Sequence, residues 1–372
     1  MRATELTRKM PIVSEALERC IYCNGSHVTR EGKRYKRRET VQLWYCRTCD
    51  RVFTPQRAKG KSYPLKVILE SLIYYYRGET RERTAEHIRE RFGISVPSRT
   101  LSAWLAEYRD LTPYAQSRDA HRAQFRPNRI IRSVRLHHQQ VYEYRIHQAK
   151  LESLLRTPKH EHLLPLEAFL WYMAASCPNG LFQADARASQ GKTSYDLDAV
   201  QILSHRNHAC RAAELVLQTV TNNRRRHDEI QRFMLATDSS TVAVEVPIYL
   251  TPDELAEFKG LPGFNIPLES DVTLTGHIDF LQVRNGAVHI VDYKPGAKSE
   301  KPIPQLMTYA LALSRRTGLR LFDMVCSWFD VIWTTVKYFR LFFLSAISWS
   351  LSLIFCLDLH QARSGAAGIR SS

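Results

Sequence analysis

Several features that would assign this 372-residue sequence to a class at once are missing from it. It has no Gly-rich phosphate loop of the GxxxxGK[ST] type, so we expect no ATP-driven motor in this chain. The first 18 residues are polar and mixed, without the apolar core of a secretory signal. The eight cysteines do not form a disulfide framework, because four lie in two CxxC pairs and the others are scattered. These absences favour an intracellular, cytoplasmic protein.

Long hydrophobic runs are also scarce. The one strongly apolar stretch is 341–357, whose 17 uncharged residues just reach the lower limit for spanning a bilayer. Acidic residues nearly vanish after Asp330, so residues 331–372 form a separate, apolar tail. We interpret this tail as a buried strand or helix, or as an aberrant ending, in preference to a membrane anchor.

Acidic residues are too few in the first part of the chain to balance the basic ones. Residues 1–150 hold 31 Lys or Arg against 15 Asp or Glu, whereas residues 151–372 hold 22 of each. The whole net charge of +16 therefore belongs to the first part. Positive charge concentrated in this way favours a polyanion, here DNA, as the partner of this segment.

The chain divides by pattern into five segments. The CxxC pairs come first, followed by three short helices, a basic and His-rich connector, a helix-then-strand unit and the apolar tail. Within the connector we expect helices over 129–155 and 166–175. The helix, strands, hairpin and helix of the fourth segment are typical of an α/β or α+β domain. The predicted boundaries are 16–56, 62–111, 112–195, 196–330 and 331–372.

The spacing of the CxxC pairs predicts a zinc site. Cys20 and Cys23 are followed, after 22 residues, by Cys46 and Cys49. Each pair forms a tight turn that presents two sulfurs to one ion, and two pairs complete a tetrahedron around Zn²⁺. Short strands are expected over 34–45 and 51–53. So small a unit has too little core to fold alone, and the metal would supply folding energy.

The segments CIYCNG and LWYCRTCDRVFTP resemble the zinc ribbons at the front of insertion-sequence transposases and related DNA-binding proteins. A basic run lies between the two cysteine pairs, in a predicted loop. Beside a metal-stabilised ribbon, such a run is expected to contact DNA phosphates. The candidate contacts are Arg34, Lys36, Arg37 and Arg38.

Residues 64–110 have the periodicity of three short helices. We expect them over 64–76, over 82–92 and from near Pro97, with Gly93 ending the second. Two helices joined by a short Gly-containing turn form a helix-turn-helix, and an ordinary helical hairpin is the alternative. RTAEHIRERFGISVPSRTLSAWL is similar to the helix-turn-helix of the same transposase-like proteins. The start of the third helix would then meet DNA bases through Ser98, Arg99 and Ser102.

The most specific chemistry lies in TGHIDFLQVRNGAVHIVDYKPG. The Asn-Gly pair at 285–286 is the strongest signal for a two-residue hairpin loop. This loop places Asp279 directly opposite Asp292, with Lys294 opposite His277 on the same face. Two like charges so placed are unfavourable alone. A hard cation such as Mg²⁺ or Mn²⁺ bound between them removes the conflict.

Lys294 indicates catalysis as well as metal binding. A lysine beside a metal-bound water can orient it or help to deprotonate it, and can offset charge that develops on a phosphate. Farther on, Pro304 opens a predicted helix in which Gln305 and Tyr309 fall at i and i+4 on one face.

Together these residues resemble the RecB-like branch of the PD-(D/E)XK nuclease superfamily, over about 200–330. The matching positions are Gly276, Asp279, Asp292, Lys294, Gln305 and Tyr309. The resemblance implies that Asp279 and Asp292 bind the metal with the carbonyl of Tyr293, and that Lys294 acts on the attacking water. The two helix residues would organise the site or contact DNA.

The same family has an acidic residue or a histidine on earlier elements. Glu245, in the strand-like run VAVEVPIYL, is the candidate acid. His205, His208 and His227 lie on the preceding predicted helix, and the choice among them stays open, with His208 the best of the three. Each is also the kind of residue that packs on a helix surface. A further core strand is expected within 321–330.

The leading hypothesis is a multidomain Mg²⁺-dependent deoxyribonuclease. A four-cysteine zinc ribbon with structural Zn²⁺ and an all-α helix-turn-helix would place the chain on DNA. An α/β PD-(D/E)XK core, of the restriction-endonuclease-like kind, would cut the phosphodiester. The alternative is a non-catalytic DNA-binding regulator or mobile-element accessory protein with an inactive nuclease-like domain. Substrate form, target sequence, biological process and oligomeric state are not determined by the sequence.

Overall fold

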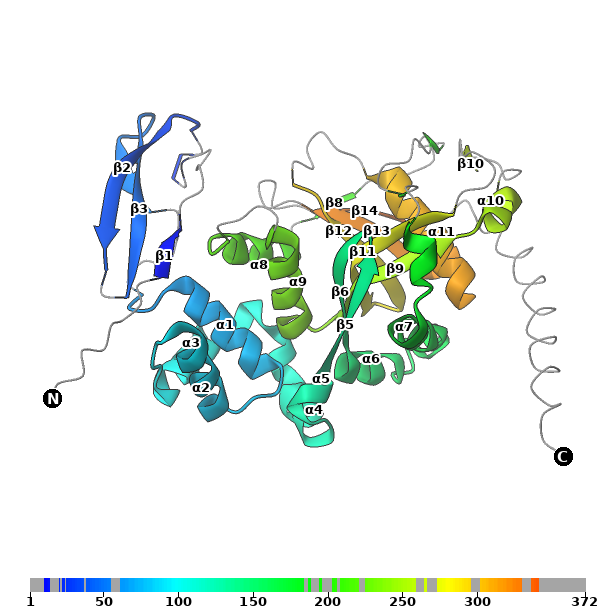
Figure 1. The fold of residues 1–372 in the computed structure, drawn as a ribbon, viewed down its shortest axis with the longest axis horizontal. Coiled ribbons are helices and arrows are strands. Elements are labelled where there is room, and N and C mark those ends of the chain that lie inside the picture. The colour runs from blue at the N-terminus through cyan, green and yellow to red at the C-terminus, as the bar shows by residue number, and fades with distance from the viewer. Residues whose placement is uncertain are drawn as a thin grey trace. The chain divides into compact units, whose positions relative to one another are not determined.

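Figure 1 shows the fold of the chain as a computed structural model. By their contacts the residues form two units. Unit 1 comprises Met1–Ile131 and His208–Ser239, and unit 2 comprises Arg132–Asn207 and Ser240–Ser372. The structure describes residues 10–13, 20, 22–23, 25–36, 38–54, 61–183, 187–188, 194–195, 203–205, 208–220, 225–258, 264–265, 273–295, 302–329 and 336–340.

Unit 1 begins with a small sheet centred on β3 (Glu39–Cys46). This strand pairs antiparallel with β2 (Val28–Tyr35) and β4 (Arg51–Phe53), and parallel with β1 (Met10–Val13). The expectation of one strand over 34–45 is wrong, because the chain turns between β2 and β3. The basic run therefore lies partly on β2. A small buried core holds the sheet together: Cys20, Trp44, Cys46 and Phe53.

The three predicted helices are α1 (Leu65–Tyr76), α2 (Arg81–Phe92) and α3 (Ser98–Glu107). Thr80 caps α2, because its hydroxyl oxygen accepts the backbone N–H three residues on at 3.1 Å. Gly93 ends α2 in the left-handed conformation, with φ 66°. The local signals for this segment are therefore confirmed.

The rest of unit 1 is also helical. Short helices follow α3, and two further helices come from much later in the sequence. They are η1 (Arg109–Leu111), η2 (Pro113–Gln116), α4 (Arg118–Gln124), α5 (Pro127–Ile130), α8 (His208–Leu217) and α9 (Arg226–Thr237). Within this unit α9 contacts both α1 and α8. The sequence predicted a domain running from 196 to 330, so the grouping of 208–239 with unit 1 differs from that expectation.

An ion cluster explains why α9 packs on α1. Glu70 of α1 is fully buried, and Arg232 of α9 donates to its two carboxylate oxygens at 3.1 and 3.0 Å. Arg91 and Lys66 also contact Glu70, at 2.7 and 3.2 Å. Lys66 contacts Glu229 of α9 as well, at 2.7 Å. Burial opposes the ionised form of Glu70, but these cations outweigh it and lower its pKa.

Unit 2 is built on a mixed sheet in the order β5-β6-β9-β11-β12-β13-β14-β8. β12 and β13 run parallel, whereas the pairs from β6 to β12 and from β13 to β8 run antiparallel. Its strands are β5 (Ile131–His138), β6 (Gln140–His147), β8 (Leu203–His205), β9 (Thr241–Leu250), β11 (Leu274–Arg284), β12 (Ala287–Tyr293), β13 (Met324–Phe329) and β14 (Val336–Arg340). A separate pair is formed by β7 (Ser194–Tyr195) and β10 (Phe264–Asn265).

Helices pack on this sheet and close its apolar core. α11 (Ile303–Thr317) contacts β9, β12, β13 and α7 (Pro165–Ser176), so it holds the middle of the sheet. The core draws on strands and helices alike and includes Leu151, Leu170, Ile278, Ile290 and Leu306. The remaining helices are α6 (Gln148–Leu155), α10 (Pro252–Phe258), η3 (Glu161–Leu163), η4 (Asn179–Gln183) and η6 (Leu321–Asp323). A mixed sheet with helices of this kind fits the predicted α/β core.

The helix predicted over 129–155 is wrong. Most of this range forms the β5–β6 hairpin, and only its last part, α6, is a helix of more than one turn. Both strands contain Val and Ile, and β6 adds two Tyr, residue types that suit a pleated surface. Gln139 makes the turn in the left-handed conformation, at φ 53°, where an Asn-Gly or Asp-Gly signal is missing. The helix predicted over 166–175 is confirmed as α7.

The β11–β12 hairpin has the predicted register. Arg284 pairs with Ala287, and the ladder runs back to Phe280 and Val291. Asn285 and Gly286 form the loop, both with positive φ, at 55° and 74°. The Asn-Gly signal was sufficient as far as Phe280 and Val291, because a two-residue loop fixes the pairing of the residues that follow it in the ladder. The two predicted pairs Asp279 with Asp292 and His277 with Lys294 lie beyond the end of this ladder, where the strands part.

The last two described strands, β13 and β14, belong to the sheet of unit 2. The core strand predicted within 321–330 is β13, and β14 pairs with it beyond the expected domain end at 330. The apolar stretch 341–357 lies outside the described residues. Within the part of the chain that is described, no helix is both long and apolar enough to cross a membrane.

The Glu70 cluster yields a stability prediction. Glu70→Ala removes the buried carboxylate that Lys66, Arg91 and Arg232 share, so we expect a loss of about 3–5 kcal/mol in the unfolding free energy of unit 1. Urea unfolding of the full chain, followed by the fluorescence of unit 1, measures it. The matched control is Glu86→Ala, which breaks an exposed pair with Arg83 and should change stability by less than about 1 kcal/mol. Equal effects of the two substitutions would contradict this role of Glu70.

Candidate functional site

The candidate site lies where β11 and β12 separate. Their ladder ends at Phe280 and Val291, one residue before Asp279 and Asp292. Beyond this point the backbone N–H of Tyr293 donates to Asp279 Oδ2 at 2.9 Å. β12 continues its pairing with β13 on the other side. The two aspartates thus lie at the point where the strands part, with their carboxylates at the end of the shared ladder.

Asp292 is 3% exposed and is contacted from two elements. Lys294 Nζ lies 3.5 Å from Asp292 Oδ2, and the side-chain amide of Gln305 in α11 donates to Asp292 Oδ1 at 3.4 Å. Lys294 itself is fixed through its backbone N–H, which donates to the carbonyl of Phe329 at 3.0 Å. A cation and an amide therefore hold this carboxylate in place.

Glu245 joins the two aspartates from the neighbouring strand. Its neighbours in β9 pair with the neighbours of Asp279 in β11, so these two residues face each other across the strands. Glu245 has φ 53°, the left-handed region that a non-glycine residue in a strand rarely adopts. Strain of this kind persists only where surrounding structure imposes it, and it gathers at functional sites.

Electrostatics of the site favour a bound cation. Burial and the charge of Glu245 raise the pKa of Asp279 to about 7, although the Tyr293 N–H and Lys294 act in the opposite direction. Glu245 and Asp279 therefore repel each other when both are ionised. The donors are oxygens, which suit Mg²⁺ or Mn²⁺ better than a softer metal. The donor set therefore fits the predicted ion.

The helix residues Gln305 and Tyr309 contact each other and the site. Gln305 donates to the Tyr309 hydroxyl oxygen at 2.9 Å, as well as to Asp292. Burial, with the nearby aspartates, raises the pKa of Tyr309, so its hydroxyl stays protonated. Gly276 makes room for this ring, since a Cβ there would lie 2.4 Å from Tyr309 Cε1. The Gly of the motif is thus explained by the Tyr of the motif.

His208, the best candidate histidine, is not brought to this site. It begins α8 in unit 1, where its Nε2 lies 3.0 Å from the carbonyl oxygen of Leu111. Of the other two candidates, His205 ends the strand β8 instead of lying on a helix, and His227 lies in α9 of unit 1.

The histidine that does lie near the aspartates is His277, which sequence reasoning placed only as a partner of Lys294. It belongs to β11, between Gly276 and Asp279. The one sequence signal for a role of His277 was its position between Gly276 and Asp279 of the motif.

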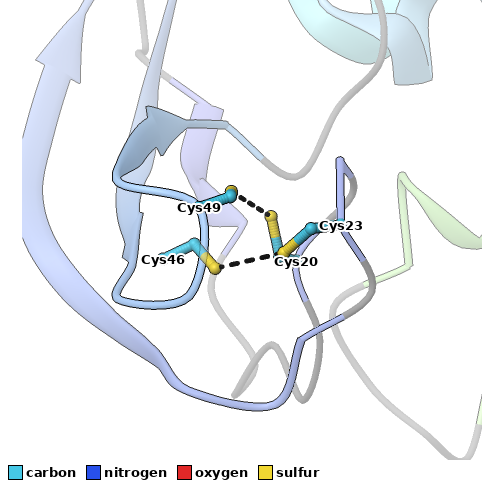
Figure 2. A group of neighbouring side chains, drawn as sticks. All are labelled: Cys20, Cys23, Cys46 and Cys49. Carbon is cyan, nitrogen blue, oxygen red and sulfur yellow. Dashed lines mark hydrogen bonds between the residues drawn. The ribbon is translucent and has the colours of Figure 1, made fainter.

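The four cysteines of unit 1 converge (Figure 2). Cys20 and Cys49 have their sulfurs 3.6 Å apart, as have Cys23 and Cys46. Tetrahedral zinc with Zn–S bonds of about 2.3 Å separates sulfurs by about 3.8 Å, so the geometry fits. Burial opposes ionisation of the Cys46 thiol, but backbone N–H groups of Cys49 and Thr48 outweigh it and lower its pKa to about 6. The group could bind zinc, as the spacing predicted.

The residues predicted to contact DNA differ in their exposure and in the side chains that they already contact. Arg34 and Arg99 are exposed, as is Ser98. Lys36 contacts Glu39 at 2.8 Å, and Arg38 covers the ring of Tyr63 at 4.0 Å. Ser102 accepts a hydrogen bond from Arg81 at 2.9 Å, while Arg37 lies outside the described residues. Arg34 and Arg99 are accordingly the strongest phosphate or base contacts of the set.

Zinc at the cysteines can be tested by metal content. The purified full chain should carry one equivalent of Zn²⁺, and Cys46→Ser should lose it, because three sulfurs no longer complete the tetrahedron. Elemental analysis after dialysis gives the ratio. Cys326→Ser is the matched control, since Cys326 is buried in unit 2 and should leave the zinc content unchanged. Zinc retained by Cys46→Ser would contradict the assignment.

The contact of Gly276 with Tyr309 gives a second prediction. Gly276→Ala forces the Tyr309 ring away, so we expect a loss of about 1–3 kcal/mol in stability from overpacking. The double variant Gly276→Ala with Tyr309→Leu should recover part of this loss, because the clashing ring is gone. Thermal unfolding of the wild type and the two variants measures these changes in stability. If Gly276→Ala is as stable as the wild type, the Tyr309 ring does not need this space.

Comparison with known proteins agrees with the site. Residues 145–326 match the family model of the PD-(D/E)XK nuclease superfamily. The match contains Gly276, Asp279, Asp292, Lys294 and the α11 residues Gln305 and Tyr309. The chain matches no curated protein and no solved structure. The pattern, its geometry and the family match together place residues 145–326 of this chain in the PD-(D/E)XK nuclease superfamily.

Proposed function

We propose that this chain is a DNA-binding, metal-dependent nuclease that hydrolyses phosphodiester bonds. The observation that carries the proposal is the gathering of Glu245, Asp279, Asp292 and Lys294 where β11 and β12 part. Three acids and one amine at one point are unfavourable for a merely structural hairpin. They are the groups that metal-assisted hydrolysis of a phosphodiester requires.

Asp279 and Asp292 would hold the metal, with the carbonyl of Tyr293 between them and Glu245 as a further acid. Mg²⁺ or Mn²⁺ bound there would polarise the phosphate and lower the pKa of a bound water. The chain supplies the orientation. Tyr293 N–H holds Asp279 at 2.9 Å, and Gln305 holds Asp292, so the two carboxylates keep fixed directions.

Lys294 would act on the attacking water. Its amine lies 3.5 Å from Asp292 Oδ2 and 23% of its side chain is exposed, so it can reach a water beside the metal ligands. A positive amine there orients the water and stabilises the charge that develops on the phosphate. Tyr309 stays protonated and works through Gln305, which makes it a positioning residue.

Unit 1 would supply the contact with DNA. A zinc-stabilised ribbon and a helix-turn-helix lie in the part of the chain that carries the whole +16 charge. Exposed Arg34 on β2 and Arg99 at the start of α3 are suited to phosphate and base edges. The acid cluster of unit 2 repels DNA until a cation occupies it, so a separate basic surface is needed for binding.

The catalytic proposal is tested with Asp292→Asn and Lys294→Ala in the full chain. Cleavage of linear, circular and single-stranded DNA with Mg²⁺ or Mn²⁺ should fall by at least about 100-fold in each, because a metal ligand or the water-orienting amine is lost. DNA binding, measured by gel shift without metal, should stay within about twofold of the wild type, since the basic surface is unchanged.

Asp253→Asn is the matched control. It removes one exposed carboxylate from α10 in the same unit and should leave the cleavage rate unaltered. If the wild-type chain binds DNA but cuts none of the three forms, the proposed activity is wrong and the chain is a DNA-binding regulator with an inactive nuclease-like domain. If Asp292→Asn cuts like the wild type, the assignment of this site fails.

A further inference from the structure

A second polar cluster in unit 2 surrounds His277, next to the candidate site. The His277 ring stacks on Tyr142 of β6, with ring centres 3.7 Å apart and planes at 11°. His277 Nε2 lies 2.8 Å from Nδ1 of His138 in β5, and His138 Nε2 lies 2.7 Å from Asn179 Oδ1. Three segments, the β5–β6 hairpin, η4 and β11, thus fix one ring.

Arg187 brings a positive charge to this cluster. Its backbone bridges Thr275 of β11, and the next N–H donates to the Thr275 carbonyl at 2.9 Å. Its guanidinium donates to the Tyr142 hydroxyl at 3.1 Å and to Gln139 Oε1 at 2.7 Å. The guanidinium is therefore held in one place by hydrogen bonds at two of its nitrogens.

Both groups that hold the guanidinium are uncharged. Among the residues described, no carboxylate forms an ion pair with Arg187, in contrast to Arg135 on β5, which contacts Glu143 at 3.1 Å. Arg187 is only partly buried, and its five N–H donors exceed the two acceptors that contact it within the described part of the chain. It keeps its full charge and has donors left for an anion, in a fork that matches phosphate oxygens.

Gln139, whose side chain accepts from Arg187, has a strained backbone. It occupies the turn between β5 and β6 at φ 53°, which a side chain other than Asn, Asp or Gly rarely adopts. Its amide also reaches the carbonyl of Gln183 at 3.3 Å, and Gln183 in turn donates to the carbonyl of His137 at 2.7 Å. The turn is therefore tied down on both sides, which makes the position of its side-chain carbonyl oxygen reproducible.

The cluster is close to the acids. His277 and Asp279 stand at i and i+2 on β11, so their side chains leave the same face of the strand. They are separated along the strand by about 6.8 Å, which corresponds to about two nucleotides of duplex rise. A phosphodiester bound at the acids would thus place a neighbouring phosphate beside the ring cluster and its cation.

We propose that Arg187 binds a phosphate of the nucleic-acid strand one or two nucleotides from the scissile bond, and that Gln139 and Tyr142 position its guanidinium. This inference rests on the proposed function, because it places the scissile phosphate at the acids. It assigns a role to the β5–β6 hairpin, which adds no residue to the acid cluster itself. Arg187 contributes strand alignment, and the acids and Lys294 contribute the chemistry.

The test couples a substitution in the protein with a change in the substrate. After the cut is mapped, a series of oligonucleotides carries one neutral methylphosphonate each, stepping along the strand. Wild type and Arg187→Ala, both as full chains, are compared on each for KM and kcat. On unmodified DNA we expect Arg187→Ala to raise KM by about 10-fold with little change in kcat, as a lost ion contact does.

Coupling is the decisive result. At one position within two nucleotides of the cut, the methylphosphonate should weaken wild type but leave Arg187→Ala unchanged, because the phosphate charge has lost its partner. Arg135→Ala is the matched control and should behave like the wild type throughout. If Arg187→Ala and the methylphosphonates act additively at every position, Arg187 does not contact the strand and the proposal is wrong.

Two further outcomes are also decided. Should Arg187→Ala fail to fold, Tyr142→Phe takes its place, because it removes one hydrogen-bond acceptor of the guanidinium. A smaller coupling with a methylphosphonate within two nucleotides of the cut is then expected. If Tyr142→Phe shows no coupling at any position, the proposal is wrong. Should the wild type cut no DNA, the proposed function fails by itself. In that case, binding of the same oligonucleotides to wild type and to Arg187→Ala is measured in the presence of Ca²⁺. Coupling between the substitution and one methylphosphonate supports the phosphate contact, and additivity at every position rejects it.

Discussion

Repulsion between the carboxylates of Glu245 and Asp279, beside the buried Asp292, is the constraint on which the candidate site of unit 2 depends. Burial, and after it the charge of Glu245, raises the pKa of Asp279 to about 7. A backbone N–H, an amide and an amine are directed at the acids and limit the penalty without removing it. The charge that remains is suited to a hard cation, which the side chains alone do not replace.

Several irregular features of the strands follow from this constraint. β11 and β12 stop pairing where the aspartates begin, Glu245 adopts a strained backbone, and Gly276 leaves space for the Tyr309 ring. Each would weaken a sheet that had only to be stable. All three lie within a few residues of the acids on β9, β11 and β12, whereas the β11–β12 ladder behind them is regular. The cost in stability is therefore confined to the place where chemistry is proposed.

Local patterns were predictable from the sequence, and long-range pairings were not. The CxxC spacing, the Asn-Gly loop and the end of α2 at Gly93 depend on a few adjacent residues, and they fold as expected. The β5–β6 hairpin was missed because its turn uses Gln139 in place of a turn-forming pair. The grouping of α9 with α1 depends on Glu70 and Arg232, which are 162 residues apart. His277 lay inside the motif, but its importance depends on rings from distant segments.

Lys294 and Arg187, the two cations of unit 2 to which roles are proposed, differ in the groups that hold them. Lys294 lies beside Asp292, so part of its charge is neutralised, and its amine is suited to a water close to the acids. Arg187 is held by uncharged oxygens and keeps its charge for an outside anion. Under the two proposals, a substrate with one phosphate would occupy only one of these positions. A strand with successive phosphates would occupy both, so the two proposals together imply a polynucleotide as the substrate in preference to a single nucleotide.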